Sequence, residues 1–189
     1  MCGIVGYVGE RDCTDVLLDS LSKLEYRGYD SAGIAVFENG EITVEKAKGE
    51  LKNLREKVAE HKPMGHCGIG HTRWATHGEP SDINSHPHGN KRVSIVHNGI
   101  IENYKDIKNF LIEKGYTFIS ETDTETVAKL LDYYYEGDPV DAIIKTLKDV
   151  RGAYALGIVF KDFPDRIFAV RKDSPLIIGA GDEENFIAS

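Results

Sequence analysis

The sequence predicts a single α+β domain built from mostly antiparallel sheets, and three observations support this fold class. Strand-like segments outnumber the helical crossovers that a parallel sheet would need. The Asn39-Gly40 dipeptide between two such segments is the strongest short-range signal of a two-residue hairpin. The 189 residues are 41% hydrophobic and contain no internal repeat, low-complexity tract or clear linker, so one folded domain is expected.

The chain opens on a strand and a helix, which a hairpin follows. Residues 3–8 are predicted to form a short buried strand because they are an apolar run rich in β-branched residues. Apolar residues at helical spacing predict a helix from residue 14 that stops at Gly28. Segments 32–37 and 41–46 lie on either side of the Asn-Gly turn and are expected to pair as antiparallel strands.

The middle of the chain contains a long loop between two predicted strands. A surface helix is expected over residues 51–60 and a strand over 68–74. Residues 76–90 are rich in Gly, Pro, Ser, Asn and His, and this segment is too long to be only a connection. A strand over 93–97 follows, so the loop is expected to serve a function.

The second half of the chain begins with three predicted helices, over residues 104–114, 122–135 and 140–150. Thr122 and Glu125 stand three residues apart at the start of the second of these helices, which is the spacing of a capping box. The remaining predicted strands are 153–160 and 166–170, on either side of an Asp-Phe-Pro-Asp turn, and 175–178.

Charge and hydropathy exclude several classes of protein. The formal net charge is −8 and no Lys/Arg cluster is present, which argues against a nucleic-acid partner. No apolar run approaches the roughly 20 residues of a membrane span, and no signal peptide follows Met1, so no membrane partner and a cytoplasmic location are expected. The apolar residues at 184–189 indicate that the chain is cut from a longer one.

Cysteine and histidine spacing does not indicate a metal site. The three cysteines, Cys2, Cys13 and Cys67, provide no disulfide framework, and at least one thiol should be free. All seven histidines lie between residues 61 and 97, yet His86-x-His88 is the nearest approach to a ligand pair. Loop and core histidines are the alternative explanation. We therefore expect no metal and no other cofactor, and we expect Cys13 and Cys67 to be buried, inert thiols.

Cys2 has a property that no interior cysteine has. If Met1 is removed, the thiol and a free α-amine belong to the same residue, and that amine has an ordinary pKa of roughly 7.7 to 8.0. Such an amine can take the thiol proton directly or through one water. Cys2 is therefore a candidate nucleophile with its own base, and an accidental cysteine at position two is the alternative.

Four other residues suit the chemistry of an amide substrate. Asn98 and Gly99 supply a side-chain amide and an unobstructed backbone N–H for a developing oxyanion, or they form a plain turn. Arg73 could hold a carboxylate with its guanidinium fork, or lie on the surface. Asp123 could pair with a substrate ammonium, or serve only as a favourable acid at a helix start. Together with a thiol nucleophile, these groups suit glutamine or asparagine.

Five motifs resemble those of the class II glutamine amidotransferases, a group of N-terminal-nucleophile hydrolases. They are CGIVG at 2–6, EYRGYDSAG at 25–33, HTRWATHG at 71–78, HNGIIEN at 97–103 and SETDTE at 120–125. Their wording is similar to the branch whose full-length enzymes make glucosamine-6-phosphate, rather than to the purine branch. The resemblance runs nearly from end to end and implies that residues 1–189 form one domain of this kind, a four-layer αββα sandwich with mostly antiparallel sheets.

The resemblance also implies a role for each matching residue. Cys2 would attack the glutamine amide, and Asn98 and Gly99 would form the oxyanion hole. Arg73 would bind the substrate carboxylate and Asp123 its ammonium. The further residues implied are Thr76 and His77 beside the carboxylate, Trp74 in a lid over the substrate, Arg27 as a support of the cysteine terminus, and His86 and His88 facing a partner domain.

The activity implied is hydrolysis of L-glutamine to glutamate and ammonia through a γ-glutamyl thioester. In the full-length enzyme, expected to be a homo-oligomer, this ammonia would serve glucosamine-6-phosphate synthesis from fructose-6-phosphate on C-terminal isomerase domains, which are absent from this chain. Two other hypotheses remain open. One is a non-catalytic domain that senses glutamine or assists assembly, and the other is an amide hydrolase of the same superfamily that acts on different substrates.

Overall fold

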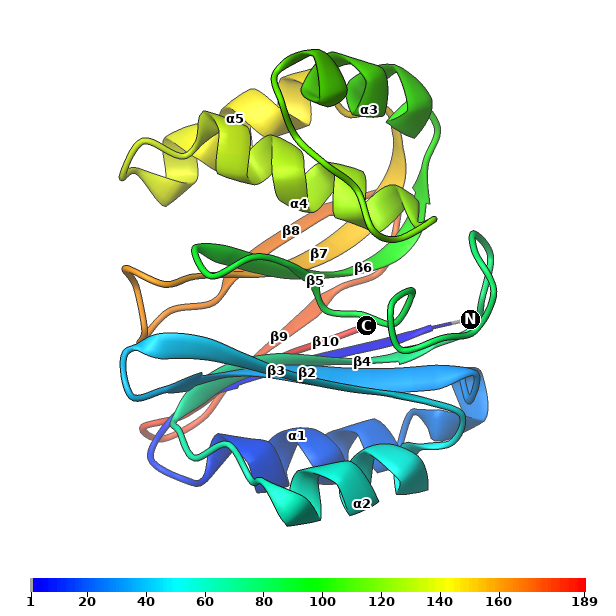
Figure 1. The fold of residues 1–189 in the computed structure, drawn as a ribbon. Helices are drawn as coiled ribbons and strands as arrows, with labels where there is room; N and C mark the ends of the chain where they lie inside the picture. The colour runs from blue at the N-terminus through cyan, green and yellow to red at the C-terminus, as the bar shows by residue number, and fades with distance from the viewer. Residues whose placement is uncertain (1) are drawn as a thin grey trace.

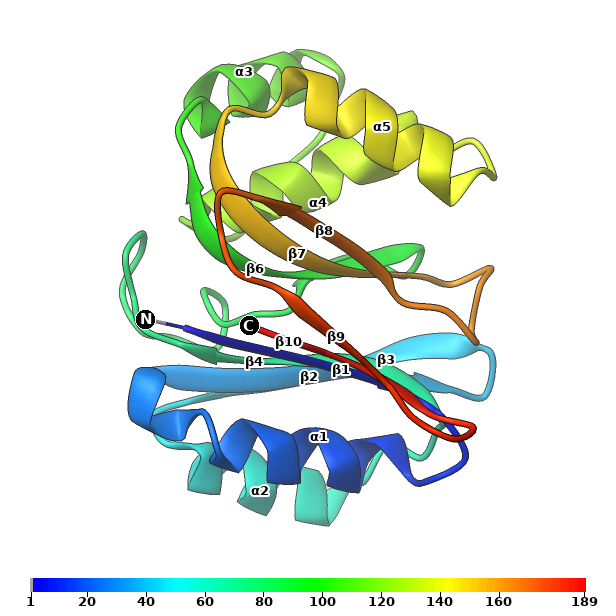
Figure 2. The same ribbon diagram turned by 180° about the vertical axis from the view of Figure 1, so that it is seen from behind.

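The computed structural model describes residues 2–189 and arranges them in four layers, with two sheets between two layers of helices (Figures 1 and 2). The predicted removal of Met1 concerns a residue outside this range. The elements are β1 (Gly3–Val8), α1 (Cys13–Ser22), the 3₁₀ helix η1 (Glu25–Arg27), β2 (Ser31–Glu38), β3 (Glu41–Lys48), α2 (Leu51–Glu60), β4 (Cys67–Arg73), β5 (His88–Gly89), β6 (Val93–Ile101), α3 (Tyr104–Glu113), α4 (Asp123–Tyr134), α5 (Pro139–Asp149), β7 (Gly152–Phe160), β8 (Phe168–Lys172), β9 (Ile177–Ala180) and β10 (Asn185–Ala188).

Both sheets are antiparallel, as the sequence predicts. The six-stranded sheet has the order β3-β2-β4-β1-β10-β9, and the four-stranded sheet has the order β5-β6-β7-β8. The predicted hairpin joins β2 to β3, where Asn39 and Gly40 have φ values of 51° and 81°. Positive φ at both central residues is what a type I′ turn requires, and Asn-Gly meets that requirement at little cost. The αββα sandwich is confirmed.

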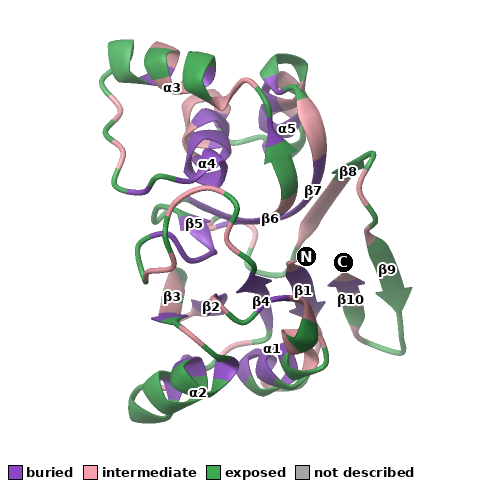
Figure 3. Cartoon of the chain, turned by 90° about the vertical axis from the view of Figure 1, so that its right-hand side faces the viewer, coloured by how far each residue is buried: buried purple, intermediate pink, exposed green. Residues whose placement is uncertain are grey.

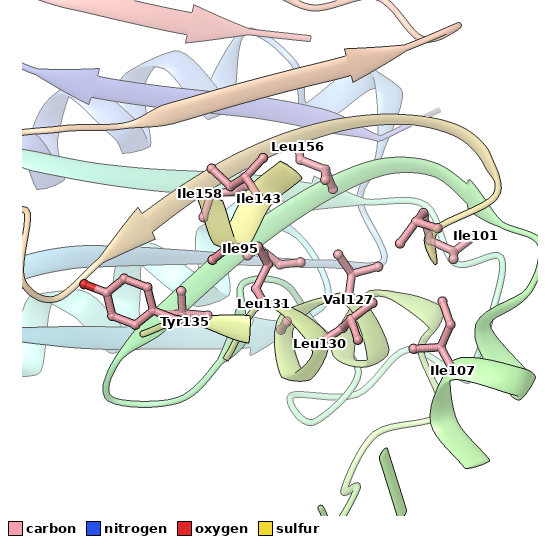
Figure 4. Close-up of a cluster of buried hydrophobic side chains, with 14 of the residues drawn as sticks. Ile95, Ile101, Ile107, Val127, Leu130, Leu131, Tyr135, Ile143, Leu156 and Ile158 are labelled. Atoms are coloured by element: carbon pink, nitrogen blue, oxygen red, sulfur yellow. The ribbon is translucent and has the colours of Figure 1, made fainter. Parts of the chain in front are cut away.

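Three apolar cores hold the four layers together. Leu17 and Leu54 belong to the core between helices α1 and α2 and the six-stranded sheet, and Ile69 belongs to the core between the two sheets. Ile95 and Leu131 belong to the largest core, between the four-stranded sheet and helices α3 to α5 (Figure 4). Burial is greatest in the central strands, and exposed residues lie on the outer faces of the helices and on β9 (Figure 3).

Truncation of one buried side chain of the largest core should lower stability strongly. Leu131 is 1% exposed on α4, and its side chain packs in the core beneath β6 and β7. Leu131→Ala is expected to lower the free energy of unfolding by about 2–5 kcal/mol, the range for leucine truncations that leave a cavity. Urea unfolding followed by circular dichroism measures this loss. Surface substitutions usually change the free energy of unfolding by less than about 0.5 kcal/mol. A change that small in Leu131→Ala would show that the core is not packed as described.

The first helix ends earlier than its apolar spacing predicts. Helix α1 stops at Ser22, because Lys23 N–H bonds to Ser20 O and Leu24 N–H bonds to Leu21 O, which tightens the last turn. The separate turn η1 follows and carries Arg27. The prediction of one continuous helix to Gly28 is therefore wrong, and the break directs η1 toward the end of β4, where Asp30 N–H bonds to Arg73 O.

Strand β6 continues four residues beyond the predicted end at residue 97. Asn98 and Gly99 lie inside it, paired with Ala155 and Tyr154 of β7. An Asn-Gly dipeptide favours a turn, but the continuous ladder with β7 overrides this local preference. The alternative of a plain turn at these residues is wrong.

The strands after β7 differ from prediction in position and number. Strands β8 and β9 each begin two residues late, because Arg166 N–H still bonds to Phe163 O within the turn and Pro175 has no N–H to donate. Strands β5 and β10 were not predicted, since two and four residues carry little periodicity. Strand β10 exists because it pairs with β1, from the other end of the chain.

The predicted capping box at the start of α4 forms only in part. Thr122 Oγ1 accepts from Glu125 N–H at 3.2 Å, as expected of an N-cap. The Glu125 carboxylate does not return to the N-cap; it accepts instead from Ser120 N–H at 2.7 Å and from Ile119 N–H. Thr122 thus holds the helix start while Glu125 holds the preceding loop.

None of the helices formed by residues 2–189 is long and apolar enough to cross a membrane.

Candidate active site

A cavity of about 370 Å³ lies where the ends of β1, β4, β6 and β10 meet. Its volume falls in the range typical of small-molecule sites. The structure brings together here all nine residues that the sequence analysis assigned to catalysis, substrate binding or support. They are Cys2, Arg27, Arg73, Trp74, Thr76, His77, Asn98, Gly99 and Asp123.

Cys2 directly precedes β1, and its thiol lies beside the end of β4. Trp74 N–H donates to Cys2 Sγ at 3.1 Å. Burial raises the pKa of this thiol above its usual value, while the Trp74 hydrogen bond and the positive charge of Arg73 act in the opposite direction. At neutral pH the group is therefore mainly a thiol, and a base is needed to activate it.

The other two cysteines are buried and remote from the cavity, as predicted. Cys13 starts α1 and Cys67 starts β4, and each belongs to an apolar core. Burial raises the pKa of the Cys67 thiol to about 12 and that of Cys13 even further. Neither thiol is positioned or ionised to act as a nucleophile.

Asn98 and Gly99 line the same cavity as Cys2, from the middle of the sandwich. Asn98 Nδ2 donates to Cys2 O at 3.2 Å and to Ser189 Oγ at 3.1 Å. Gly99 has a φ of 125°, and a Cβ there would lie 2.1 Å from Ala153 O, so no other residue fits without moving the strand. A side-chain amide and a glycine backbone therefore stand together at the cavity, as an oxyanion site requires.

Arg73 is a buried cation with no carboxylate partner among the residues that the structure describes. It ends β4 and is 3% exposed, so the alternative of a surface arginine is wrong. Its guanidinium donates to the carbonyls of His77 and of Gly78, the latter at 3.0 Å, and forms no salt bridge within residues 2–189. A positive charge that borders a cavity and lacks a counter-ion favours an anionic ligand there.

Asp123 supplies the opposite charge across the cavity. It is the first residue of α4, is 5% exposed, and accepts from Ile101 N–H at 2.8 Å through Oδ2. The helix N-terminus stabilises its negative charge, so the structural and the ligand-binding interpretations of this residue are compatible. A cation and an anion within one cavity suit a zwitterionic ligand.

The segment after β4 forms one wall of the cavity. Trp74 is 47% exposed and meets the Tyr29 ring edge-on with ring centroids 5.6 Å apart. Ala75 N–H donates to Asp30 Oδ2 at 2.7 Å and anchors the base of the segment. An exposed tryptophan beside an anchored base is compatible with the lid predicted for this loop.

Sequence reasoning missed a cluster of four buried histidines beside the cavity, of which His86 and His97 line it. His86 lies at its centre, with its ring centroid 4.1 Å from that of His71, 4.9 Å from that of His88 and 6.4 Å from that of His97. His86 and His88 are 6% and 4% exposed, so the expectation that they face a partner domain is wrong. Within residues 2–189 no three metal-binding side chains are arranged to hold an ion. Ser189, also missed, is brought to Asn98 by β10.

The histidine cluster should make the protein sensitive to acid. Burial lowers the pKa of all four imidazoles, that of His71 to about 3. The unfolded chain takes up protons on them near pH 6.5 and the folded chain does not, so stability present above that pH is lost as the pH falls toward 3. For His71 alone the loss between pH 7.5 and pH 5.0 is about 2 kcal/mol.

Urea unfolding at the two pH values measures this loss, and His71→Gln, which has no titrating ring, is the matched variant. We expect the stability difference between pH 7.5 and pH 5.0 to be smaller in His71→Gln by about 2 kcal/mol. Equal differences in the two proteins would mean that the folded state protonates His71 as readily as the unfolded state does.

The αββα sandwich is the fold of the N-terminal-nucleophile amidotransferases, and in this chain Cys2 directly precedes its first strand and lines the cavity. The fold is similar to the B. subtilis glutamine phosphoribosylpyrophosphate amidotransferase complexed with ADP and GMP, with a TM-score of 0.86 and 26% identity over 99% of this chain and 41% of that one. A Silicibacter pomeroyi class II glutamine aminotransferase domain protein has the same fold, with a TM-score of 0.70 at 17% identity.

Residues 71–189 match the family described as "Glutamine amidotransferase domain". The chain is 59% identical to the isomerizing glutamine–fructose-6-phosphate aminotransferase of Clostridium perfringens and 61% identical to that of Caldanaerobacter subterraneus, over 100% of this chain and 31% of each relative. The chain therefore belongs to the glutamine amidotransferase domain family. It spans about a third of the length of these relatives.

Proposed function

We propose that this chain hydrolyses L-glutamine to glutamate and ammonia through a γ-glutamyl thioester on Cys2. The observation that carries the proposal is the convergence of four groups on one cavity: the Cys2 thiol, the Asn98 amide, the Arg73 cation and the Asp123 carboxylate. An α-amino acid with a side-chain amide has one complementary group for each of them. Family membership supports the same substrate.

The reaction starts from a Cys2 that has lost Met1. Its α-amine takes the Sγ proton, directly or through one water, and the sulfur attacks the side-chain amide carbon of glutamine. The carbonyl bond opens to an oxyanion, which Asn98 Nδ2 and Gly99 N–H stabilise. The α-ammonium returns the proton to the departing nitrogen, which leaves as ammonia, and a water then hydrolyses the thioester to glutamate and the free thiol.

The substrate backbone is held at the two charged walls of the cavity. Arg73, with Thr76 and His77 beside it, binds the α-carboxylate, and Asp123 binds the α-ammonium. Closure of the Trp74 segment excludes water and strengthens these charge interactions. Arg27, which lines the cavity from η1, supports the cysteine terminus. The site thus binds both charged groups of the substrate, in agreement with specificity for an amino acid over a simple amide.

This chain matches about a third of each relative's length, and the remaining part suggests where the ammonia is used. The Clostridium perfringens relative is named an isomerizing glutamine–fructose-6-phosphate aminotransferase. We propose that in the full-length protein C-terminal isomerase domains use the ammonia to convert fructose-6-phosphate to glucosamine-6-phosphate. The full-length protein would act as a homo-oligomer in the cytoplasm. Light scattering of the full-length protein tests the first of these points, and cell fractionation tests the second.

The first experiment is intact-mass analysis before and after incubation with 6-diazo-5-oxo-norleucine, an electrophilic glutamine analogue, together with an assay of glutamate release. We expect loss of Met1, one adduct on Cys2, and turnover of glutamine but not of asparagine or simple amides. Retained Met1 and no turnover would support the glutamine-sensing or assembly hypothesis. Equal turnover of simple amides would support an amide hydrolase of different specificity.

The role of Asp123 predicts a specific kinetic change. Asp123→Asn keeps the acceptor for Ile101 N–H but removes the negative charge. The KM for glutamine should rise by about 10- to 100-fold, because a hydrogen bond to a charged group contributes about 1.5–3 kcal/mol. Initial rates against glutamine concentration measure this change. Asp106→Asn, in the exposed first turn of α3, is the matched control and should leave the KM unaltered. An unaltered KM in Asp123→Asn would exclude ammonium binding at Asp123.

A further inference from the structure

We propose that His71 is a positioning residue, which holds the Asn98 amide with its nitrogen toward the reacting atoms. The inference rests on the proposed function. His71 lies on β4 and Asn98 on β6, so the contact between them bridges the two sheets of the sandwich. His71 does not line the cavity, and any effect on catalysis must therefore pass through Asn98.

The hydrogen bonds around His71 determine which ring nitrogen carries the proton. His71 Nε2 lies 3.0 Å from His97 O and 3.0 Å from Asn98 Oδ1. A carbonyl and an amide oxygen both accept, so Nε2 must be the donor to both. Because the ring is fully buried and neutral, its single hydrogen is on Nε2, and Nδ1 is left without a partner among the described residues.

The contacts on the other side of the amide agree with this assignment. Asn98 Nδ2 faces Cys2 O at 3.2 Å and Ser189 Oγ at 3.1 Å. Ser189 donates its own hydrogen to Pro175 O at 2.6 Å, so its oxygen is free to accept from Asn98. The amide is therefore held at both ends, with the oxygen on His71 and the nitrogen on the Cys2 backbone carbonyl and Ser189.

The orientation matters because the two ends of an amide have opposite polarity. Without a donor at the His71 position, rotation of the amide by 180° would bring Oδ1 beside Cys2 O and toward the developing oxyanion. Two partial negative charges would then meet where the reaction needs a donor. His71 disfavours this alternative, because its Nε2–H can donate only to the amide oxygen and so stabilises only the productive orientation.

The loss of stability that His71 is expected to cause supports a functional interpretation of this residue. A buried polar nitrogen without a partner destabilises a folded protein, and an apolar side chain between the sheets would avoid this penalty. The ring is also wedged against His86, with centroids 4.1 Å apart, which restricts its rotation. A costly and rigid donor at this place is explained by the orientation that it imposes on Asn98.

A double-mutant cycle on glutamate release tests the proposal. His71→Leu should lower kcat by about 10- to 100-fold with a KM change below about threefold, because a displaced catalytic group costs rate of this order. In the Asn98→Ala background the same substitution should lower kcat by less than about threefold, since no amide remains to be oriented. Equal losses in both backgrounds would mean that His71 acts only through general stability, and would overturn the proposal.

Two conservative variants test the position of the donor in case His71→Leu does not fold. A glutamine amide nitrogen reaches the place of Nε2, whereas an asparagine amide nitrogen reaches only that of Nδ1. We expect His71→Gln to retain kcat within about fivefold, and His71→Asn to lose as much as His71→Leu. Equal activity in the two variants would overturn the proposal. Parent protein that releases no glutamate at all would overturn the proposed function itself, a result that these variants cannot produce.

Discussion

Replacement of Cys2 by alanine is expected to abolish glutamate release and to leave the fold unchanged. No other thiol can substitute, because Cys13 and Cys67 are buried in apolar cores away from the cavity. Loss of a nucleophile that forms the covalent intermediate lowers kcat by about a thousandfold or more. The side chain is small and lies at the start of β1, so the free energy of unfolding should change little. Coupled detection of glutamate measures the rate, and circular dichroism verifies the fold.

The two buried cysteines provide matched controls for this prediction. Cys13→Ala and Cys67→Ala remove the same atom from core positions, so they should lower stability by about 1–2 kcal/mol and leave the rate of glutamate release nearly unaltered. Only Cys2→Ala should also lose reaction with 6-diazo-5-oxo-norleucine. Glutamate release that persists in Cys2→Ala would exclude the thioester mechanism.

Replacement of Asn98 by alanine should lower the turnover of glutamine by about a hundredfold or more, the usual effect of removing one oxyanion donor. The KM should change little, because the amide stabilises charge that develops only in the transition state. Asn98→Asp has the same shape and places a carboxylate where the oxyanion forms, so we expect it to be at least as slow. Steady-state kinetics with glutamine measure both variants.

Asn53→Ala is the matched control for Asn98→Ala. Asn53 lies on α2, where its amide donates to Lys48 O, and it is remote from the cavity. Its removal should not alter turnover. Unchanged turnover in Asn98→Ala would remove this side chain from the mechanism and leave the oxyanion to the Gly99 N–H alone.

Local patterns predict most elements of this fold because those elements are stabilised locally. The Asn39-Gly40 turn requires two residues with positive φ, and the dipeptide alone predicts it. The predicted ends of strands were wrong where pairing with a strand distant in the sequence prevails over the local conformational preference of the residues. Strand β6 passes through Asn98 because β7 pairs with it, and β10 forms because it joins β1, whose paired residues lie 177 to 183 positions earlier in the chain.

The resemblance to the sugar-phosphate branch was also readable from the motifs. The relatives at 59% and 61% identity are isomerizing glutamine–fructose-6-phosphate aminotransferases, whereas the B. subtilis phosphoribosylpyrophosphate enzyme is 26% identical. The contacts of His71 and Ser189 with Asn98 could not be predicted, because no spacing in the sequence indicates them.

The sequence by itself determined the chemical groups that this protein has available: a thiol with a nearby α-amine, an amide beside a glycine, a guanidinium and a carboxylate. Only the tertiary structure decided which of them meet, because their segments are separated by tens of residues and approach one another only when the two sheets pack. The same packing decided that Arg73 is buried with no counter-ion in the described part of the chain and that His71 must donate through Nε2. Local propensity is set by neighbours along the chain, while hydrogen-bond direction and burial are set by neighbours in space.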